Sequence, residues 1–191
     1  MLLSIGFAAV IGVGLGIATG RFPRLRRILL SVTGTLLTIP SFALFGLLIP
    51  VFGLGLAPIV VALTVYAVFP ILRNTVTGLE TVDPAVIDAA RGVGLGSWQL
   101  LWRVQLPMAW PVILNGIRVA TIMVVAIAAI GAAVRGPGLG ELIFRGLSRI
   151  GGANALNEAL SGLVGVVLVA LVLDLFFLLV RRFTTPRGLH V

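Results

Sequence analysis

The sequence contains no cysteine and no lysine, and its single histidine, His190, lies one residue from the C-terminus. Without cysteine, disulfide bonds, thiol catalysis and cysteine-based metal sites are excluded. A phosphate-binding P-loop needs a lysine after its glycines, so the chain cannot hold such a nucleotide site. Six acidic residues and one terminal histidine do not supply a Ser–His–Asp set or paired carboxylates in a cleft. We therefore expect no enzymatic activity, no catalytic residue and no metal site in this chain.

Charged residues are also scarce, at 10% of the chain, whereas hydrophobic residues make up 59%. An ordinary soluble domain has about 25% charged residues, and so apolar a chain would expose extensive hydrophobic surface in water. The net charge of +8 comes from arginines that gather at the ends of apolar runs. This distribution is a topology signal rather than a phosphate-binding stripe. The composition predicts a protein of the lipid bilayer and no nucleic-acid partner.

The apolar runs predict about five membrane-spanning helices within one transmembrane domain, 1–191, because about 20 apolar residues cross a bilayer. The predicted spans cover 1–19, 28–49, 57–72, 111–134 and 160–180. A signal peptide is the rival interpretation of the first run, but no basic region precedes it and no small-residue cleavage site stands out. Pro40 falls inside the second span and should kink that helix.

The connections between these spans indicate the orientation of the chain. The segment 73–110 is polar, and in the segment 135–159 the apolar residues predict a short helix in the membrane interface plane. An external N-terminus places ten arginines inside, which are Arg21, Arg24, Arg26, Arg27, Arg73, Arg91, Arg103, Arg181, Arg182 and Arg187. Three, Arg135, Arg145 and Arg149, then lie outside. This excess on one side predicts that 73–110 and the C-terminus are cytoplasmic.

The longest polar interruption, 82–107, has the signals of two short helices. Asp83 is a good N-cap, and Pro84 suits the first helical position, where its missing N–H costs nothing. The helix 85–91 should end at the glycines that follow, which are Gly92, Gly94 and Gly96. A second amphipathic segment, 98–106, runs into Pro107. Two short helices around a glycine hinge, between membrane spans, predict a docking surface.

Within this interruption, Asp88-Ala89-Ala90, Gly94 and Val104-Gln105-Leu106-Pro107 resemble the "EAA" loop of permease subunits of ATP-binding-cassette (ABC) importers. That loop reads Glu-Ala-Ala, three residues, Gly, nine residues, Ile-x-Leu-Pro. The spacing here matches at every step, with Asp in place of Glu and Val in place of Ile. Ile71-Leu72-Arg73-Asn74-Thr75, with Val82-Asp83-Pro84-Ala85, is similar to the branch that imports osmoprotectants. The likeness covers roughly residues 30–188.

The resemblance implies an all-α, polytopic membrane protein of the bacterial plasma (inner) membrane, with the five-helix core of the type I (MetI-like) importer class. It implies a second permease subunit, identical or different, and ATP-binding cassette subunits that bind the loop and hold ATP and Mg, so that this chain needs no cofactor. A separate extracytoplasmic substrate-binding protein would select the cargo. The coupling residues that it implies are Asp83, Asp88, Ala89, Ala90, Gly92, Gly94, Leu106 and Pro107.

Polar residues within the predicted spans are candidates for further roles. Ser41, Tyr66 and Asn115 could line a translocation path, although hydrogen bonding within their own helices explains each equally well. Arg118 and Asp174 each lie about 10 Å from the cytoplasmic end of their helices. Opposite charges at equal depth should form an ion pair; the alternative is that Arg118 snorkels to the interface while Asp174 faces water.

Three tryptophans lie in or beside the cytoplasmic loop, and quaternary ammonium ligands are often held in aromatic cages. We interpret Trp98, Trp102 and Trp110 instead as an interfacial belt or a contact with the ATPase subunit.

The predicted function is thus the permease subunit of an ATP-driven importer for glycine betaine, choline, carnitine or related quaternary ammonium compounds. A permease of the same class for an amino acid, a metal chelate or a sulfonate is the first alternative. A secondary carrier would need repeats and a mid-membrane ion site; no inverted repeat is visible, and only Asp174 could serve as that site. A regulatory membrane scaffold is the third alternative.

Overall fold

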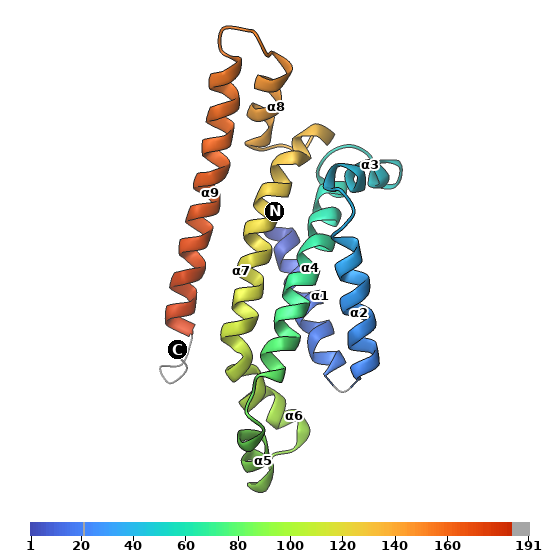
Figure 1. The fold of residues 1–191 in the computed structure, drawn as a ribbon, viewed down its shortest axis with the longest axis vertical. Helices are drawn as coiled ribbons and strands as arrows, with labels where there is room; N and C mark the ends of the chain where they lie inside the picture. The colour runs from blue at the N-terminus through green and yellow to red at the C-terminus, as the bar shows by residue number, and fades with distance from the viewer. Residues whose placement is uncertain (21, 185–191) are drawn as a thin grey trace.

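The structure, a computed structural model, describes residues 1–20 and 22–184 and is helical over most of this length (Figure 1). Its elements are α1 (Leu2–Thr19), α2 (Pro23–Leu36), α3 (Ser41–Phe52), α4 (Leu56–Glu80), α5 (Pro84–Gly92), α6 (Ser97–Leu100), the π-helical turn η1 (Leu101–Gln105), α7 (Leu106–Ile130), the 3₁₀ turn η2 (Gly131–Val134), α8 (Gly140–Ser148) and α9 (Ala155–Thr184). Arg21 and Arg187, which count toward the predicted orientation, and His190 lie outside the described residues.

Four helical stretches are long and apolar enough to cross a membrane, and α2 with α3 would make a fifth crossing if the two form one span. The four stretches are α1, α4, the continuous run Ser97–Val134 and α9. Helix α4 continues to Glu80, beyond the predicted end of its span at residue 72. The segment 98–106 does not stop at Pro107, because the helical run continues through this residue, which is the second residue of α7 and follows the π-helical turn η1.

The predicted span 28–49 is not a single kinked helix. Helix α2 ends at Leu36, α3 begins at Ser41, and the two are bent by 95° (Figure 1). Pro40, in an extended conformation, is the N-cap of α3, since proline cannot continue the hydrogen-bond ladder of a preceding helix. The buried Tyr66 of α4 donates its hydroxyl to the carbonyl of Ile39 at 2.8 Å. Tyr66 therefore satisfies a carbonyl that the break frees, and the expected kink becomes a full break.

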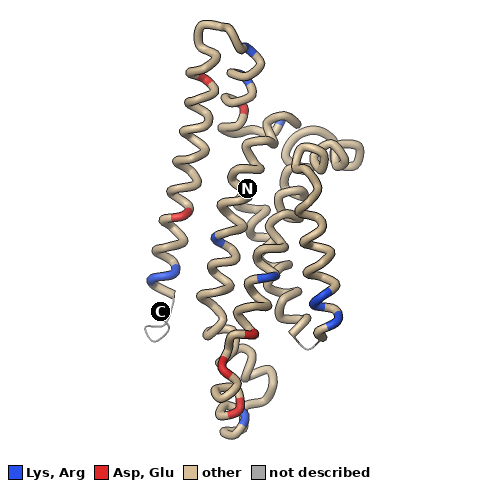
Figure 2. Tube along the Cα trace, in the orientation of Figure 1, with Lys and Arg blue, Asp and Glu red and all other residues tan. Residues whose placement is uncertain are grey.

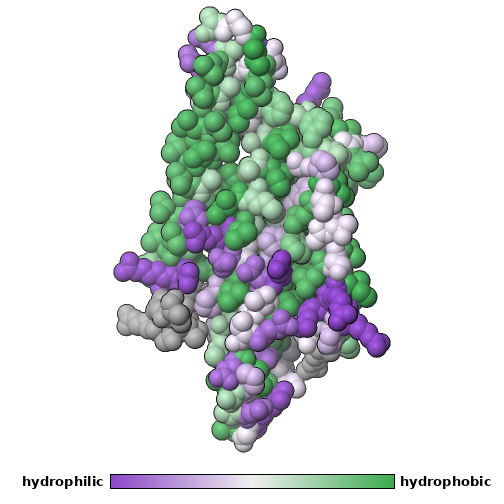
Figure 3. All heavy atoms as spheres, in the orientation of Figure 1, coloured by the Kyte–Doolittle hydropathy of each residue, from purple (hydrophilic) through white to green (hydrophobic). Residues whose placement is uncertain are grey.

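Helix α4 is the centre of the fold, and α1, α2, α3 and α7 all pack against it (Figure 1). Its side chains Leu63, Ile71 and Leu72 are fully buried, with Ala8 of α1 and Val124 of α7 against the same core. Helix α9 differs, because no residue of its most apolar stretch is buried within the chain. Apolar side chains on its surface are visible in Figure 3. This surface is suited to lipid or to another apolar helix.

Helix α1 approaches α4 closely through two glycines on one face. A methyl group added to Gly12 would lie 2.9 Å from Cβ of Ile71, and one added to Gly16 would lie 2.7 Å from Cβ of Thr75. On the other side of α1, an added methyl group at Gly14 would meet nothing within 4 Å. Helices in a bilayer associate chiefly by such close packing, since lipid is as apolar as their side chains.

Gly16→Val is therefore expected to destabilise the permease by about 1–3 kcal/mol, because the added side chain overpacks the contact with Thr75. Gly14→Val, with the same change in helix propensity on the open face, is the matched control. Thermal melts of the detergent-purified protein measure both variants. Equal melting temperatures for the two would contradict the close approach of α1 and α4.

At the opposite end from α5 and α6, α8 and the first turns of α9 form a helical hairpin (Figure 1). Gly162 allows this contact, because a methyl group there would lie 2.8 Å from Cγ1 of Ile143. Glu141 and Arg145 form an ion pair at 2.7 Å on α8. The short helix expected within 135–159 is thus present as α8, and its place in the membrane interface plane stays a prediction.

Candidate functional site

A segment of two short helices protrudes beyond the ends of α4 and α7 (Figure 1). We call residues 81–105 the protruding segment; it holds α5, α6 and η1. Two apolar side chains anchor it to the bundle, since Val82 and Leu100 are each only 4% exposed. Helix α5, in contrast, has no buried residue. Its whole outer face is available to another protein.

Local signals in the sequence account for the start and end of α5. The carboxylate of Asp83 accepts a hydrogen bond from the backbone N–H of Ala85 at 2.8 Å, as an N-cap does. At the other end, the N–H of Leu95 bonds the carbonyl of Ala90 and the N–H of Gly94 bonds that of Arg91. These two bonds form a Schellman motif, which needs its penultimate residue in the left-handed region. Gly94 has a φ of 87°, so this glycine, rather than Gly92, reverses the chain.

The predicted coupling residues on α5 lie at the surface. Asp88 and Ala89 are exposed and Ala90 is half-buried. The carboxylate of Asp88 lies 3.6 Å from the guanidinium of Arg91, one turn along, in an exposed pair that contributes little stability. Two further predicted coupling residues, Leu106 and Pro107, lie outside α5 and begin α7 at the base of the protruding segment. Helix α5 therefore offers a surface on which Asp88 and Ala89 can meet a partner.

The second half of the protruding segment, α6 and η1, is continuous with α7, and we call it the return arm. Helix α6 passes into η1 and then into α7 without a break, over Ser97–Val134 including η2. The side-chain carbonyl of Gln99 accepts from the backbone N–H of Gly96 at 3.1 Å, which stabilises the start of this arm. A force on α6 is therefore transmitted to α7 through helical backbone.

The structure brings Arg118 of α7 and Asp174 of α9 together. Nε of Arg118 lies 2.6 Å from Oδ1 of Asp174, and Nη2 lies 2.8 Å from Oδ2, so the guanidinium binds both carboxylate oxygens. The two side chains are 28% and 26% exposed within the single chain, so the pair is half-buried rather than buried. Such a two-bond geometry fixes one helix relative to the other.

The three candidate path residues have different surroundings. Tyr66 is buried and bonded to Ile39, Ser41 is the half-buried first residue of α3, and Asn115 is exposed on α7. None of them lines the cavities of about 460 Å³ and 180 Å³. Their role in a path stays a prediction. Among residues 1–20 and 22–184, no cluster of three or more acidic or histidine side chains could hold a metal ion.

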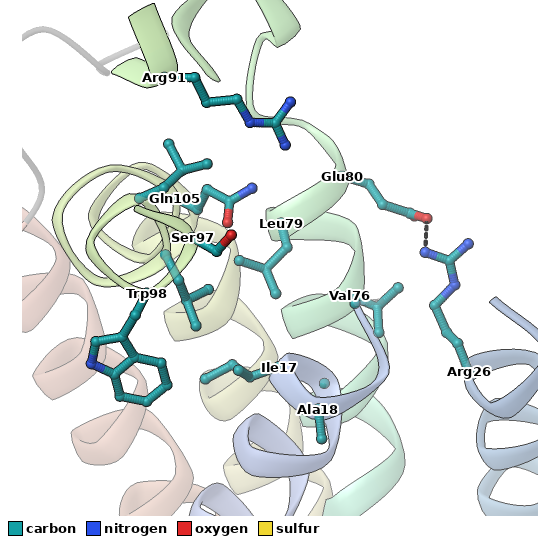
Figure 4. Close-up of a pocket in the computed structure, with 14 residues that line it drawn as sticks. Ile17, Ala18, Arg26, Val76, Leu79, Glu80, Arg91, Ser97, Trp98 and Gln105 are labelled. Carbon is teal, nitrogen blue, oxygen red and sulfur yellow. Dashed lines mark ion pairs between the residues drawn. The ribbon is translucent and has the colours of Figure 1, made fainter. Parts of the chain in front are cut away.

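Sequence reasoning missed the larger of these cavities, a cleft of about 460 Å³ where α1, α4 and the protruding segment meet (Figure 4). Its walls combine apolar side chains such as Ile17, Val76 and Leu79 with the charged Arg26, Glu80 and Arg91. These residues come from separate elements and share no sequence motif. Only the packing of the helix ends brings them together.

Comparison with known proteins places this geometry in a family. Residues 10–187 match the family described as "binding-protein-dependent transport system inner membrane component". The osmoprotectant import permease protein OsmW of Salmonella typhimurium is 40% identical over 193 residues, which cover 98% of this chain and 88% of that protein. The glycine betaine/carnitine/choline transport system permease protein OpuCB of Bacillus subtilis is 32% identical, covering 99% of this chain and 85% of that protein.

A solved structure supports the same conclusion. An inward-facing conformation of the MetNI methionine ABC transporter superposes with a TM-score of 0.83 at 27% identity, over 97% of this chain and 91% of that one. The expected all-α, MetI-type fold is confirmed. The chain is a multi-pass inner-membrane transport subunit rather than an enzyme, and ATP hydrolysis lies in a partner subunit. The chain belongs to the family of inner-membrane permease components of binding-protein-dependent transport systems.

Proposed function

We propose that this chain is the permease subunit of an ATP-driven importer for osmoprotectants, which are glycine betaine, choline, carnitine or related quaternary ammonium compounds. The observation that supports this cargo is the likeness, over nearly the whole chain, to OsmW and OpuCB, whose names specify such compounds. An amino-acid cargo is the second candidate, since the MetNI transporter is also similar, at the lower identity of 27%.

The protruding segment is proposed to receive the ATP-binding cassette subunit, which would bind ATP and Mg. The exposed face of α5 and the glycine-closed turn after it support this role, because both allow the backbone of a partner to approach closely. Closure of two such subunits would move α7 through the continuous arm, as a rigid body. An extracytoplasmic binding protein is proposed to dock at the other end, near the hairpin of α8 and α9, and a second permease, identical or different, completes the pathway.

The arginines support an N-terminus outside the cell and a C-terminus in the cytoplasm. Figure 2 shows basic residues at the start of α2 and the end of α9, at the end of the bundle that holds the protruding segment. Arg24, Arg26, Arg27, Arg73, Arg91, Arg103, Arg181 and Arg182 belong to the proposed cytoplasmic side, and Arg135, Arg145 and Arg149 to the other. This bias follows the positive-inside rule.

Uptake by proteoliposomes tests the proposed function. The permease is reconstituted with its ATPase and binding protein, and labelled glycine betaine, choline, carnitine and methionine are supplied outside with ATP inside. We expect ATP-dependent accumulation of at least one quaternary ammonium compound and none of methionine. Accumulation without the ATPase subunit would instead indicate a secondary carrier, and uptake of methionine alone would contradict the cargo.

A further inference from the structure

The cleft between α1, α4 and the protruding segment has two basic groups on different walls (Figure 4). Arg26 comes from the first turn of α2, and Arg91 comes from the last turn of α5. In Figure 4 the Glu80 and Arg26 pair lies at one side of the cleft, Trp98 at the opposite side and Arg91 across from Ala18 of α1. The lining residues include two arginines and one glutamate, so the lining itself carries a net positive charge.

Both guanidinium groups can still donate hydrogen bonds. Glu80 is the only carboxylate that pairs with Arg26 among residues 1–20 and 22–184, and Nη1 of Arg26 lies against Oε1 of Glu80. Arg91 is 66% exposed, and its contact with Asp88 is long, at 3.6 Å. An arginine has five N–H donors in a fixed fork that matches a phosphate or carboxylate. The cleft can therefore accept an anion between the two arginines.

The surroundings of the cleft indicate a membrane lipid as the source of that anion. Ile17, Val76 and Leu79 give one part of its wall an apolar surface, which suits the beginning of an acyl chain. Trp98 and Trp102 lie edge to face, with ring centroids 5.5 Å apart, and are 69% and 52% exposed. Exposed tryptophans of membrane proteins gather at the level of the lipid headgroups. Basic pockets between helices at that level bind anionic headgroups.

We propose that this cleft binds the headgroup of an anionic phospholipid, with its phosphate between Arg26 and Arg91. The proposal is independent of the cargo and relies on the proposed orientation only for the choice of the cytoplasmic leaflet. The bound lipid would join the start of α2 to the protruding segment, since one arginine comes from each. Glu80 competes with the lipid for Arg26.

Native mass spectrometry of the intact complex tests this site. The complex of permease and ATPase, purified in detergent and stripped of lipid, is titrated with phosphatidylglycerol or phosphatidylcholine. We expect phosphatidylglycerol to bind more tightly, and we expect the double variant Arg26→Gln with Arg91→Gln to weaken its binding about 10- to 30-fold. The matched control is Arg24→Gln with Arg27→Gln, which removes the same charge from exposed positions outside the cleft.

A variant expected to strengthen lipid binding separates this role from a structural role of the Arg26–Glu80 ion pair. Glu80→Gln removes the competing carboxylate, so it should strengthen binding of phosphatidylglycerol, whereas Arg26→Gln should weaken it. The proposal would be overturned if the two double variants lost phosphatidylglycerol binding equally or if neither lost it. Weaker binding of phosphatidylglycerol by Glu80→Gln would overturn it too. Displacement of the lipid by an equal concentration of glycerol 3-phosphate would overturn it as well, because the ligand would then be a soluble phosphate.

Discussion

Gly94→Asp is expected to abolish ATP-driven uptake while the permease still inserts into the membrane. Gly94 closes α5 with a φ of 87°, a conformation that costs a residue with a side chain about 1–2 kcal/mol. A Cβ at this position would meet nothing within 4 Å in the chain itself. The new carboxylate would therefore project into the space that the ATPase subunit is proposed to occupy. Docking should fail although the helices still pack.

Three measurements on this variant distinguish docking from folding: the amount of permease in the membrane, co-purification of the ATPase and uptake. Gly151→Asp is the matched control, because Gly151 also has a positive φ, of 94°, and open space around it, in the turn between α8 and α9. The control should keep the ATPase bound. Uptake by Gly94→Asp near the wild-type rate would show that the protruding segment does not couple the two subunits.

Removing either partner of the pair Arg118–Asp174 is the second change with a large expected effect. In soluble proteins the stranded partner of a desolvated ion pair costs about 3–5 kcal/mol. Because about a quarter of each side chain is exposed within the chain, we expect a smaller cost than this range, about 2–3 kcal/mol. The melting temperature of the purified complex should fall by roughly 5–10 °C for Arg118→Ala and for Asp174→Ala.

The double variant Arg118→Met with Asp174→Leu should recover part of this loss, since it leaves no charge without a partner and fills the space with apolar atoms. Arg181→Ala, at an exposed position near the end of α9, is the control and should leave the melting temperature nearly unchanged. Strictly additive losses in the double variant would mean that the two charges do not stabilise each other.

Features that depend on neighbouring residues could be predicted from the sequence. The cap at Asp83 and the turn at Gly94 involve partners within a few positions, so the residue types alone indicate the geometry. The meeting of Arg118 and Asp174 was also predictable, although these residues are far apart in the chain. Depth in the bilayer restricts where a charge on a spanning helix can lie, and few alternatives remain.

Features that depend on packing between residues far apart in the chain could not be predicted from the sequence. Pro40 predicts a disturbance of its helix, but the 95° bend also depends on the hydroxyl of Tyr66, which comes from α4. The charges of the cleft between α1, α4 and the protruding segment show the same limit, because Arg26, Glu80 and Arg91 lie in three different helical elements or their ends. No periodicity or spacing relates such residues before the helices are packed.

The unbroken run from α6 through η1 into α7 would act as a lever of defined length if the protruding segment moved. From Ser97 to Arg118 it extends for about 30 Å at 1.5 Å per residue, so a tilt of about 10° at one end displaces the other by about 5 Å. Arg118 is also the residue through which this helical run binds α9, since it donates two hydrogen bonds to Asp174. A displacement of the protruding segment would therefore move α9 as well, although the most apolar stretch of α9 has no residue buried within the chain.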